Sequence, residues 1–311
     1  MPRKRDEIAR VTNGYSPAMI EQVTSMALTI AHHSGRERFS WEDLVESITT
    51  LESGTAIGIE YIEREGLATA VHEAGHAIAG HAYMKDFEST RLSIRRRGDS
   101  GGHHQAREKE ERFGYFQSEM FAKLVWGLGA MAAERVVYGE NTNGVGGDVM
   151  SVTAQTAGMV GGAAMGPLPF VATPRDGETE EDARLRALER LEGIGLQIMN
   201  RISFGGGMGV PDPIGGALSD PSKRRVASQI IGQAYVVAHN LAANNREAVD
   251  RIAAALMEKK EIFGDELMDL LDSVGIRIPE LDYGDETIWP PPFFSISSPQ
   301  RPQQPRELQQ P

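Results

Sequence analysis

The sequence of 311 residues contains no cysteine. This absence excludes a disulfide framework, a thiolate metal site and a cysteine nucleophile, so any metal ligand must be histidine, aspartate or glutamate. Basic residues are also scarce, with 32 lysines and arginines against 44 aspartates and glutamates and a net charge of -12. Binding to nucleic acid or to an anionic membrane surface needs a basic face, so we expect no nucleic-acid partner.

Long apolar runs are missing as well. No window approaches the roughly 20 apolar residues that cross a bilayer, and no apolar stretch follows the charged N-terminus. We therefore expect a soluble, cytoplasmic protein. The apolar share of 40% is enough to form a real core in one or two domains.

The most informative stretch is His72-Glu73-Ala74-Gly75-His76, which matches the zinc-hydrolase motif H-E-x-x-H. Residues four apart lie on one face of a helix, so both imidazoles can share a metal ion that Glu73 flanks without ligating. The surrounding alanines, with Val71 and Ile78, favour a helix here. The alternative interpretation is a pair of core histidines bonded to backbone groups.

We expect a mainly α fold. Residues 1–55 form a small helical unit, in which Ser16-Pro17 opens one helix and Ser40-Trp41-Glu42-Asp43, close to a capping box, opens the next. His32-His33 falls at the end of the first helix, where we expect solvated side chains.

Residues 56–280 form the main domain, which contains the motif helix and a small β element. Alternating apolar residues predict a half-buried strand at 90–95, and helical spacing returns at 116–138. A glycine-rich loop over 141–147 then leads to Asp148 at the start of another helix.

The C-terminal part is less regular. Glycine and proline over 161–220 indicate a partly mobile insertion with one charged helix at 178–191. Long helical periodicity follows at 223–257, with a short final helix at 265–271. The Pro- and Gln-rich tail, 281–311, is expected to be disordered, and its proline run favours a linker over docking on an aromatic groove.

A catalytic zinc site needs a third protein ligand and an open position. His81 lies about 140° around a continuing helix from His76, so it cannot join the same metal. The pair His103-His104 falls in a glycine-rich, charged loop and reaches the metal only through a fold-back.

Two distant carboxylates, Glu134 and Asp148, remain as candidate third ligands. Asp148 is favoured because a loop-to-helix junction flanked by glycines permits close approach to another helix. A plain helix N-cap is the alternative role of Asp148.

Several segments resemble the FtsH-like AAA+ zinc metalloproteases. Residues 70–77, AVHEAGHA, are similar to that family's zinc helix, and residues 129–139, GAMAAERVVYG, to the segment before its glycine loop. Asp148 falls where the family keeps its third zinc ligand, and residues 223–271 resemble its closing helices. The resemblance is good over 59–160 and 223–271.

The resemblance implies a zinc endopeptidase in which His72, His76 and Asp148 hold zinc. Glu73 would act as general base, and we expect Glu134 to orient a ligand histidine. The strand near residues 92–94 would pair with an extended substrate. We expect the substrates to be unfolded or flexible polypeptides.

Residues 8–52, with Gly14-Tyr15-Ser16-Pro17-Ala18, also resemble the small helical lid of the family's ATPase. No G-x-x-x-x-G-K-[ST] loop occurs, so we expect no ATP hydrolysis from this chain. The family's membrane anchor is also missing, which fits either a fragment or a natural chain without its motor. A separate AAA+ ATPase partner and a homo-oligomer, a hexamer by resemblance, are expected. Departures from the family are Gly147, where asparagine is usual, and the 161–220 insertion.

Two other hypotheses compete with the endopeptidase. A noncatalytic or partner-dependent subunit of an AAA+ protease assembly would use the same body for binding, but such a role requires none of the motif's groups. An ordinary helical structural domain would bind no stoichiometric zinc.

Overall fold

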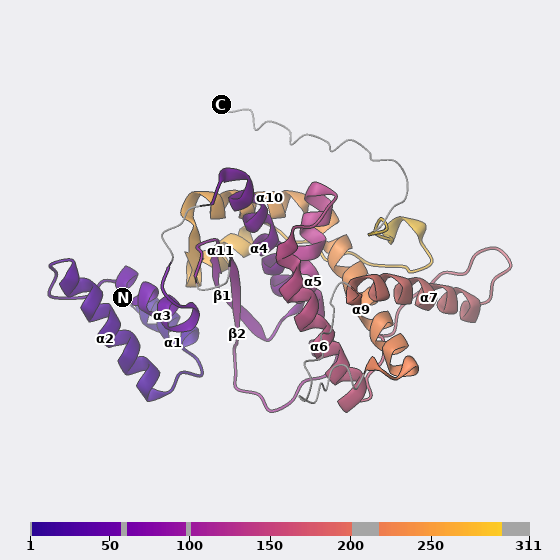
Figure 1. The fold of residues 1–311 in the computed structure, drawn as a ribbon, viewed down its shortest axis with the longest axis horizontal. Coiled ribbons are helices and arrows are strands. Elements are labelled where there is room, and N and C mark those ends of the chain that lie inside the picture. The colour runs from indigo at the N-terminus through magenta and orange to yellow at the C-terminus, as the bar shows by residue number, and fades with distance from the viewer. Residues whose placement is uncertain (1, 57–60, 98–100, 201–217, 294–311) are drawn as a thin grey trace.

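The computed structural model describes residues 2–56, 61–97, 101–200 and 218–293. The chain is mainly α-helical with one small sheet, as the sequence predicts (Figure 1). The elements, in chain order, are α1 (Pro2–Val11), α2 (Pro17–His33), α3 (Trp41–Ser53), α4 (Glu63–Tyr83), β1 (Phe87–Ser93), β2 (His103–Glu108), α5 (Gln117–Tyr138), η1 (Asn143–Val145), α6 (Gly146–Gly162), α7 (Glu180–Met199), α9 (Pro221–Asn244), α10 (Arg246–Lys259), β3 (Glu261–Phe263), α11 (Gly264–Ser273) and η2 (Glu286–Ile288).

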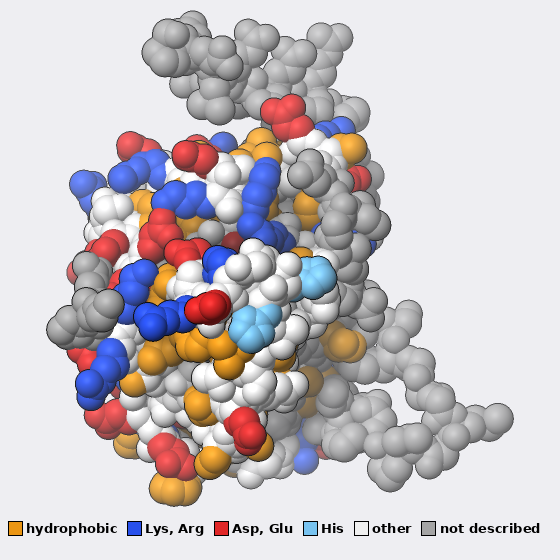
Figure 2. Space-filling view, turned by 90° about the vertical axis from the view of Figure 1, so that its left-hand side faces the viewer, with side chains coloured by type: hydrophobic (Ala, Val, Ile, Leu, Met, Phe, Trp, Pro, Cys, Tyr) orange, Lys and Arg blue, Asp and Glu red, His pale blue; other side chains and the backbone are white. Residues whose placement is uncertain are grey.

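Helices α1, α2 and α3 form an N-terminal unit at one side of the molecule (Figure 1). The expected caps are present: the Ser16 hydroxyl accepts from the Met19 amide at 3.3 Å, and Ser40 and Asp43 form a reciprocal capping box. A second small core holds the unit together and joins it to the sheet, with Val11, Val23 and Ile48 buried beside Phe263 of β3. On this side of the molecule, charges of both signs are interspersed with apolar side chains (Figure 2).

Helices α4 and α5 cross at the centre of the main domain (Figure 1). The crossing is close because glycines meet there: a Cβ atom added to Gly75 would lie only 2.4 Å from the Gly129 carbonyl oxygen. Leu124, Leu128 and Met131 of α5 are fully buried around this contact. The small residues in the motif helix thus let two backbones approach closely, which fixes the side chains that they carry.

The sheet is antiparallel, in the order β2–β1–β3. Leu92 of β1 is paired with His104 of β2 on one side and with Ile262 of β3 on the other. The proposed pairing of a substrate with the strand near residues 92–94 is therefore wrong, because both edges of that segment are already hydrogen-bonded. Within the described residues, β2 and the three-residue β3 are the two edge strands, and β2 is the longer of them.

The long helical pattern over 223–257 forms two helices, α9 and α10, with the break at Asn245. The Asn245 side chain donates to the carbonyls of Leu241 and Arg277 at 2.8 Å and accepts from the Arg277 amide at 2.7 Å. It therefore links the break to the segment after α11.

The expected insertion contains a well-packed helix. Helix α7 crosses α9 with backbone contact, since a Cβ atom on Gly195 would lie 1.8 Å from the Ser228 carbonyl oxygen. Leu191 and Ile198 are fully buried there. Residues 201–217 of the insertion lie outside the described residues.

The tail is not disordered over 281–293. Tyr283, Ile288 and Trp289 are buried against α7 and α9, and the Asn240 amide donates to the Ile288 carbonyl at 2.7 Å. Burial of these apolar side chains is enough to hold the segment in place. The Pro- and Gln-rich composition of the tail does not indicate this burial. The rest of the tail, residues 294–311, lies outside the described part of the chain.

No helix in the described residues has both the length and the apolar character needed to cross a membrane.

Candidate metal centre

Helix α4 carries both histidines of the H-E-x-x-H motif on one face. The ring centroids of His72 and His76 lie 5.0 Å apart. Both side chains are largely buried, with 14% and 9% of their surfaces exposed. One turn of helix therefore presents two imidazoles to the same point, as the spacing predicts.

Asp148 reaches these histidines from the first turn of α6. Its Oδ2 atom lies 3.2 Å from His72 Nε2, and its Oδ1 atom lies 3.5 Å from His76 Nε2. The loop before it makes a tight turn at η1, where the Thr142 hydroxyl accepts from the Gly144 amide. The structure thus brings together His72, His76 and Asp148, which are far apart in the sequence, as one group able to hold a metal ion.

The spacing of these atoms fits a tetrahedral zinc ion. With ligand bonds of about 2.0–2.1 Å, two ligand atoms of such an ion are separated by about 3.3 Å. The observed separations, 3.2 Å from His72 to Oδ2 and 3.5 Å from His76 to Oδ1, are close to that value, and one ligand atom from each of the three residues lies within 4.8 Å of the other two. The donor set of two imidazoles and one carboxylate is also that of a catalytic zinc site.

Both imidazoles use their other nitrogen for a protein acceptor. His72 Nδ1 donates to Glu134 Oε1 and His76 Nδ1 to the Trp126 carbonyl, each at 2.8 Å. The Nε2 lone pairs therefore point at the Asp148 carboxylate, and this convergence of negative potential requires a cation, either a proton or a metal ion.

The pKa shifts of His72 and Asp148 also indicate that the site stabilises a positive charge beside the carboxylate. Burial by itself would lower the pKa of His72, but hydrogen bonds to Asp148 and Glu134 raise it to about 10. Burial would raise the pKa of Asp148, yet the two histidines hold it well below its usual range. The site is therefore built to stabilise an ionised carboxylate beside a cation.

Glu134 is completely buried and lies behind His72. Its Oε2 atom accepts from the Thr142 amide at 2.7 Å and from the Asn141 side chain at 3.2 Å. Its Oε1 atom also accepts from the Thr142 hydroxyl at 2.8 Å. Burial alone would raise the pKa of Glu134, but hydrogen bonding to His72 and Thr142 lowers it, so the buried carboxylate is ionised. It lies where it can orient the His72 ring rather than ligate the metal.

Glu73 follows His72 on α4, and only 4% of its surface is exposed. Its Oε2 atom has no hydrogen-bond partner. Burial raises the pKa of Glu73, while the neighbouring histidines His72 and His76 lower it. The residue just before strand β2 passes close by, since a Cβ atom on Gly102 would lie 2.5 Å from Glu73 Oε1. Glu73 is thus placed to exchange a proton beside the metal group.

The other histidines do not join this group. His81 lies beside Asp272, with Nε2 to Oδ1 at 3.4 Å. His103 and His104 are not in a loop, because they begin strand β2, and His104 is buried. Its neighbours in the strand are only partly buried, and hydrogen bonds to both ring nitrogens allow the His104 imidazole to occupy the buried position.

Trp126 is a site residue that sequence reasoning misses. It supports His76 through its backbone carbonyl, and every residue type has such a group. No sequence signal marks it, because the contact depends on how α4 and α5 cross.

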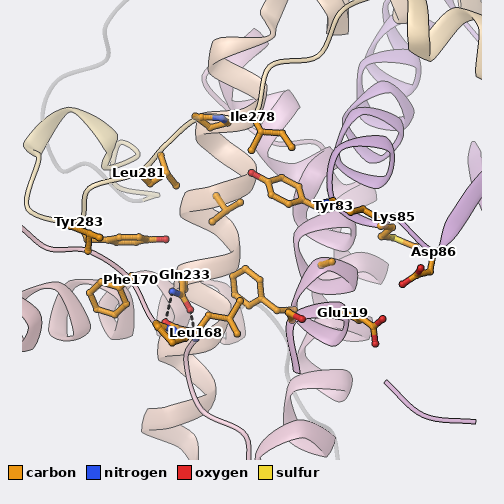
Figure 3. Close-up of a pocket in the computed structure, with 18 of the residues that line it drawn as sticks. Tyr83, Lys85, Asp86, Glu119, Leu168, Phe170, Gln233, Ile278, Leu281 and Tyr283 are labelled. Carbon is orange, nitrogen blue, oxygen red and sulfur yellow. Dashed lines mark hydrogen bonds between the residues drawn. The ribbon is translucent and has the colours of Figure 1, made fainter. Parts of the chain in front are cut away.

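A cavity of about 700 Å³ lies at the far end of α4, between α5, α9 and the segment 278–283. Tyr83 and Tyr283 project into it from opposite walls, and Gln233 fixes another wall by pairing with both backbone groups of Leu168 (Figure 3). None of the three metal-group residues lines this cavity.

Comparison with known proteins agrees with this geometry. Residues 60–187 match peptidase family M41. The chain is 28% identical to "ATP-dependent zinc metalloprotease FtsH 1" of Thermomicrobium roseum, over 97% of this chain and 43% of that protein. It is also 28% identical to the chloroplastic "ATP-dependent zinc metalloprotease FTSH 6" of Arabidopsis thaliana, over 85% of this chain and 36% of that protein.

A shorter match to the FtsH of Mycoplasma mobile reaches 31% identity, over 53% of this chain and 24% of that protein. The chain thus spans well under half the length of these curated relatives. The M41 match begins just before α4 and includes α5 and α6, the three helices that carry the metal group. The chain therefore contains, over the residues that match family M41, a peptidase domain of the kind found in the FtsH-like zinc metalloproteases.

Proposed function

We propose that this protein is a zinc-dependent endopeptidase whose zinc is held by His72, His76 and Asp148. The observation that carries this proposal is the convergence of two Nε2 atoms on one carboxylate, while both Nδ1 atoms are bonded to protein acceptors. In a histidine pair with only a structural role, the two Nε2 atoms would not be expected to converge on the same ionised carboxylate.

Zinc held by these three residues would supply a Lewis acid, able to polarise the peptide carbonyl and to lower the pKa of water toward about 7. Glu73 accepts the proton of the attacking water and delivers it to the leaving amine. Its burial suits this role, because a carboxylate with a raised pKa holds the proton between the two steps. Glu134 keeps His72 in the tautomer with the proton on Nδ1.

The edge strand β2 is the proposed binding place for the substrate. It offers unpaired backbone groups within the described residues, and it begins beside Glu73. An extended polypeptide that adds to this edge gains affinity from main-chain hydrogen bonds, with little dependence on side chains. Unfolded or flexible polypeptides are therefore the proposed substrates.

The N-terminal unit, residues 1–55, is proposed to correspond to the ATPase lid, followed by the peptidase domain over 56–280. Helix α2 exposes Ile20 and Leu28, which are each 40% accessible, and such apolar side chains suit contact with another subunit. We infer a separate AAA+ ATPase as partner and assembly into a homo-oligomer, a hexamer by likeness to the family.

The test is the variant Glu73→Gln, with zinc content and casein cleavage measured together. We expect the variant to retain stoichiometric zinc and to lose cleavage by about a hundredfold or more, because general base catalysis is removed and the ligands are untouched. Glu65→Gln makes the same change on the exposed first turn of α4 and should leave both values unchanged.

Zinc without cleavage in the wild-type protein, even with an ATPase supplied, would refute the catalytic role and favour a noncatalytic subunit.

A further inference from the structure

We propose that Trp126 and His104 are positioning residues for the ligand His76, and that they tie it to the edge strand β2. This inference rests on the proposed zinc centre, since it concerns how one of its ligands is held. It assigns a role to two side chains that the proposed chemistry does not use.

The first observation is the hydrogen bonding of His104. The indole Nε1–H of Trp126 donates to His104 Nδ1 at 2.8 Å, so that nitrogen carries no proton. The proton lies on Nε2, which donates to the Ser89 hydroxyl at 2.9 Å. Only 5% of the His104 surface is exposed. Both nitrogens of a buried, neutral imidazole are therefore satisfied, and the ring is fixed between β1 and α5.

The second observation is that Trp126 contacts His76 in two ways. Its backbone carbonyl accepts from His76 Nδ1 at 2.8 Å, and its ring centroid lies 5.8 Å from that of His76. The indole is thus held by His104 at one side and bounds the ligand ring at the other.

The third observation is the space that the helices provide for this arrangement. A Cβ atom on Gly80 would lie 3.2 Å from Trp126 Cδ1 and 3.3 Å from His104 Cε1. Helix α4 therefore has a glycine where the indole and the imidazole lie against it. The tryptophan cannot shift far in this packing without losing its hydrogen bond to β2.

These contacts join the ligand to the proposed substrate strand. His104 is the second residue of β2, and Gly102, just before that strand, lies beside Glu73. His104 is bonded to Ser89 and to the Trp126 indole, and the backbone carbonyl of the same tryptophan is bonded to His76. The orientation of His76 Nε2 and the position of the β2 edge thus depend on the same set of hydrogen bonds. Loss of the hydrogen-bond partner of a ligand histidine typically weakens metal binding by about 10–100-fold. A shift of Trp126 that moves its carbonyl from His76 Nδ1 should therefore have an effect of that order.

The test is a double-mutant cycle with zinc affinity as its readout, measured by competition with a chelator. Trp126→Phe removes the donor and keeps an aromatic ring, and His104→Leu removes the acceptor. We expect each variant to weaken zinc binding by about tenfold or more. The double variant should be no weaker than either single one, because both changes break the same bond. The visible spectrum of the cobalt-substituted protein should change in the same variants.

Two controls separate positioning from general loss of packing. Trp289→Phe makes the matched change at a buried tryptophan whose Nε1 has no partner, and it should leave zinc affinity unchanged. His104→Asn keeps an acceptor near the place of Nδ1, and it should restore zinc affinity to within about threefold of the wild type.

Zinc affinity in Trp126→Phe equal to that in Trp289→Phe, or losses that multiply in the double variant, would overturn the inference. The affinities are measured without substrate. A wild-type protein that binds zinc but cleaves no casein therefore refutes only the peptidase function, whereas one that binds no zinc refutes both proposals.

Discussion

Asp148 presents both carboxylate oxygens to histidine nitrogens, Oδ2 to His72 and Oδ1 to His76. We therefore expect the negative charge of Asp148 to contribute more to zinc affinity than the shape of its side chain. Asp148→Asn keeps the volume but removes the negative charge and places an amide against the Nε2 atoms. We expect zinc affinity to fall more than about 100-fold, beyond the effect of losing an outer partner.

Metal analysis after gel filtration measures this effect. Asp272→Asn is the matched control, because it alters an exposed carboxylate that lies 3.4 Å from His81. Retention of stoichiometric zinc by Asp148→Asn would show that the carboxylate is not a ligand.

His239 on α9 gives a prediction about pH. Burial, with a smaller effect from the Arg135 cation, lowers the pKa of His239 to about 4. An unfolded chain binds the proton near the ordinary value, about 6.5, so folding is favoured fully above that pH and loses stability as pH falls. Each pH unit between those values costs about 1.4 kcal/mol.

Urea unfolding at pH 7 and pH 5, compared between the wild type and His239→Gln, measures this contribution. The wild type should lose about 2 kcal/mol more than the variant, since glutamine has no proton to gain. Equal losses in the two proteins would mean that His239 is protonated in the folded state.

At the residue scale, the sequence predicts the candidate metal ligands that the structure brings together. His72 and His76 follow from helical geometry, and Asp148 from its loop and its place in the resembling family. Trp126 and His104 could not be predicted, because one acts through its carbonyl and the other occupies an apolar position through hydrogen bonds from a distant helix.

At the scale of elements, the crossing of α4 and α5 depends on Gly75 and Gly129. Gly75→Ala would place a methyl group 2.4 Å from a backbone oxygen, which no rotamer change can relieve. We expect a loss of about 1–3 kcal/mol in unfolding free energy, as for other overpacked cores. Zinc affinity should fall as well, because the crossing holds His76 against the Trp126 carbonyl.

Gly158→Ala is the control, since it lies on an exposed part of α6 with nothing within 4 Å of the added methyl group. It should be neutral or stabilising by up to about 1 kcal/mol. Thermal unfolding compares the two variants, and equal melting temperatures would contradict a tight crossing.

The sequence predicts the individual helices and strands better than it predicts which of them pair or pack together. Alternation identifies β1, but its neighbour β3 comes from residues 261–263, and pairing across such a distance leaves no local pattern. Asn245 breaks the long helical pattern because its amide binds the backbone of Arg277, which periodicity cannot show.

At the scale of the whole molecule, the segment 281–293 covers α7 and α9. Truncation after residue 280 would uncover the pocket of Tyr283 and Trp289, and loss of one buried aromatic side chain alone costs about 3–5 kcal/mol. We therefore expect a clear drop in melting temperature.

Truncation after residue 293 keeps every one of these contacts and serves as the control, with a melting temperature close to that of the full chain. Similar melting temperatures for both truncations would show that the segment adds no stability.

Strand β2 has a second face, opposite to that of His104. There Arg107 binds Glu52 of α3 and the Asn13 carbonyl, while nearby Arg97 binds Glu46 through two nitrogens at 2.9 and 3.1 Å. Arg91, only 1% exposed, donates to Ser53 at 2.6 Å. All of these acceptors belong to the first 55 residues, so removing the N-terminal helices would leave Arg107 and the buried Arg91 without these partners, and Arg97 with Glu261 of β3 at 3.8 Å. The N-terminal helices therefore neutralise arginine side chains that the sheet and its flanking residues bring to the boundary, so the stability of the sheet depends on them.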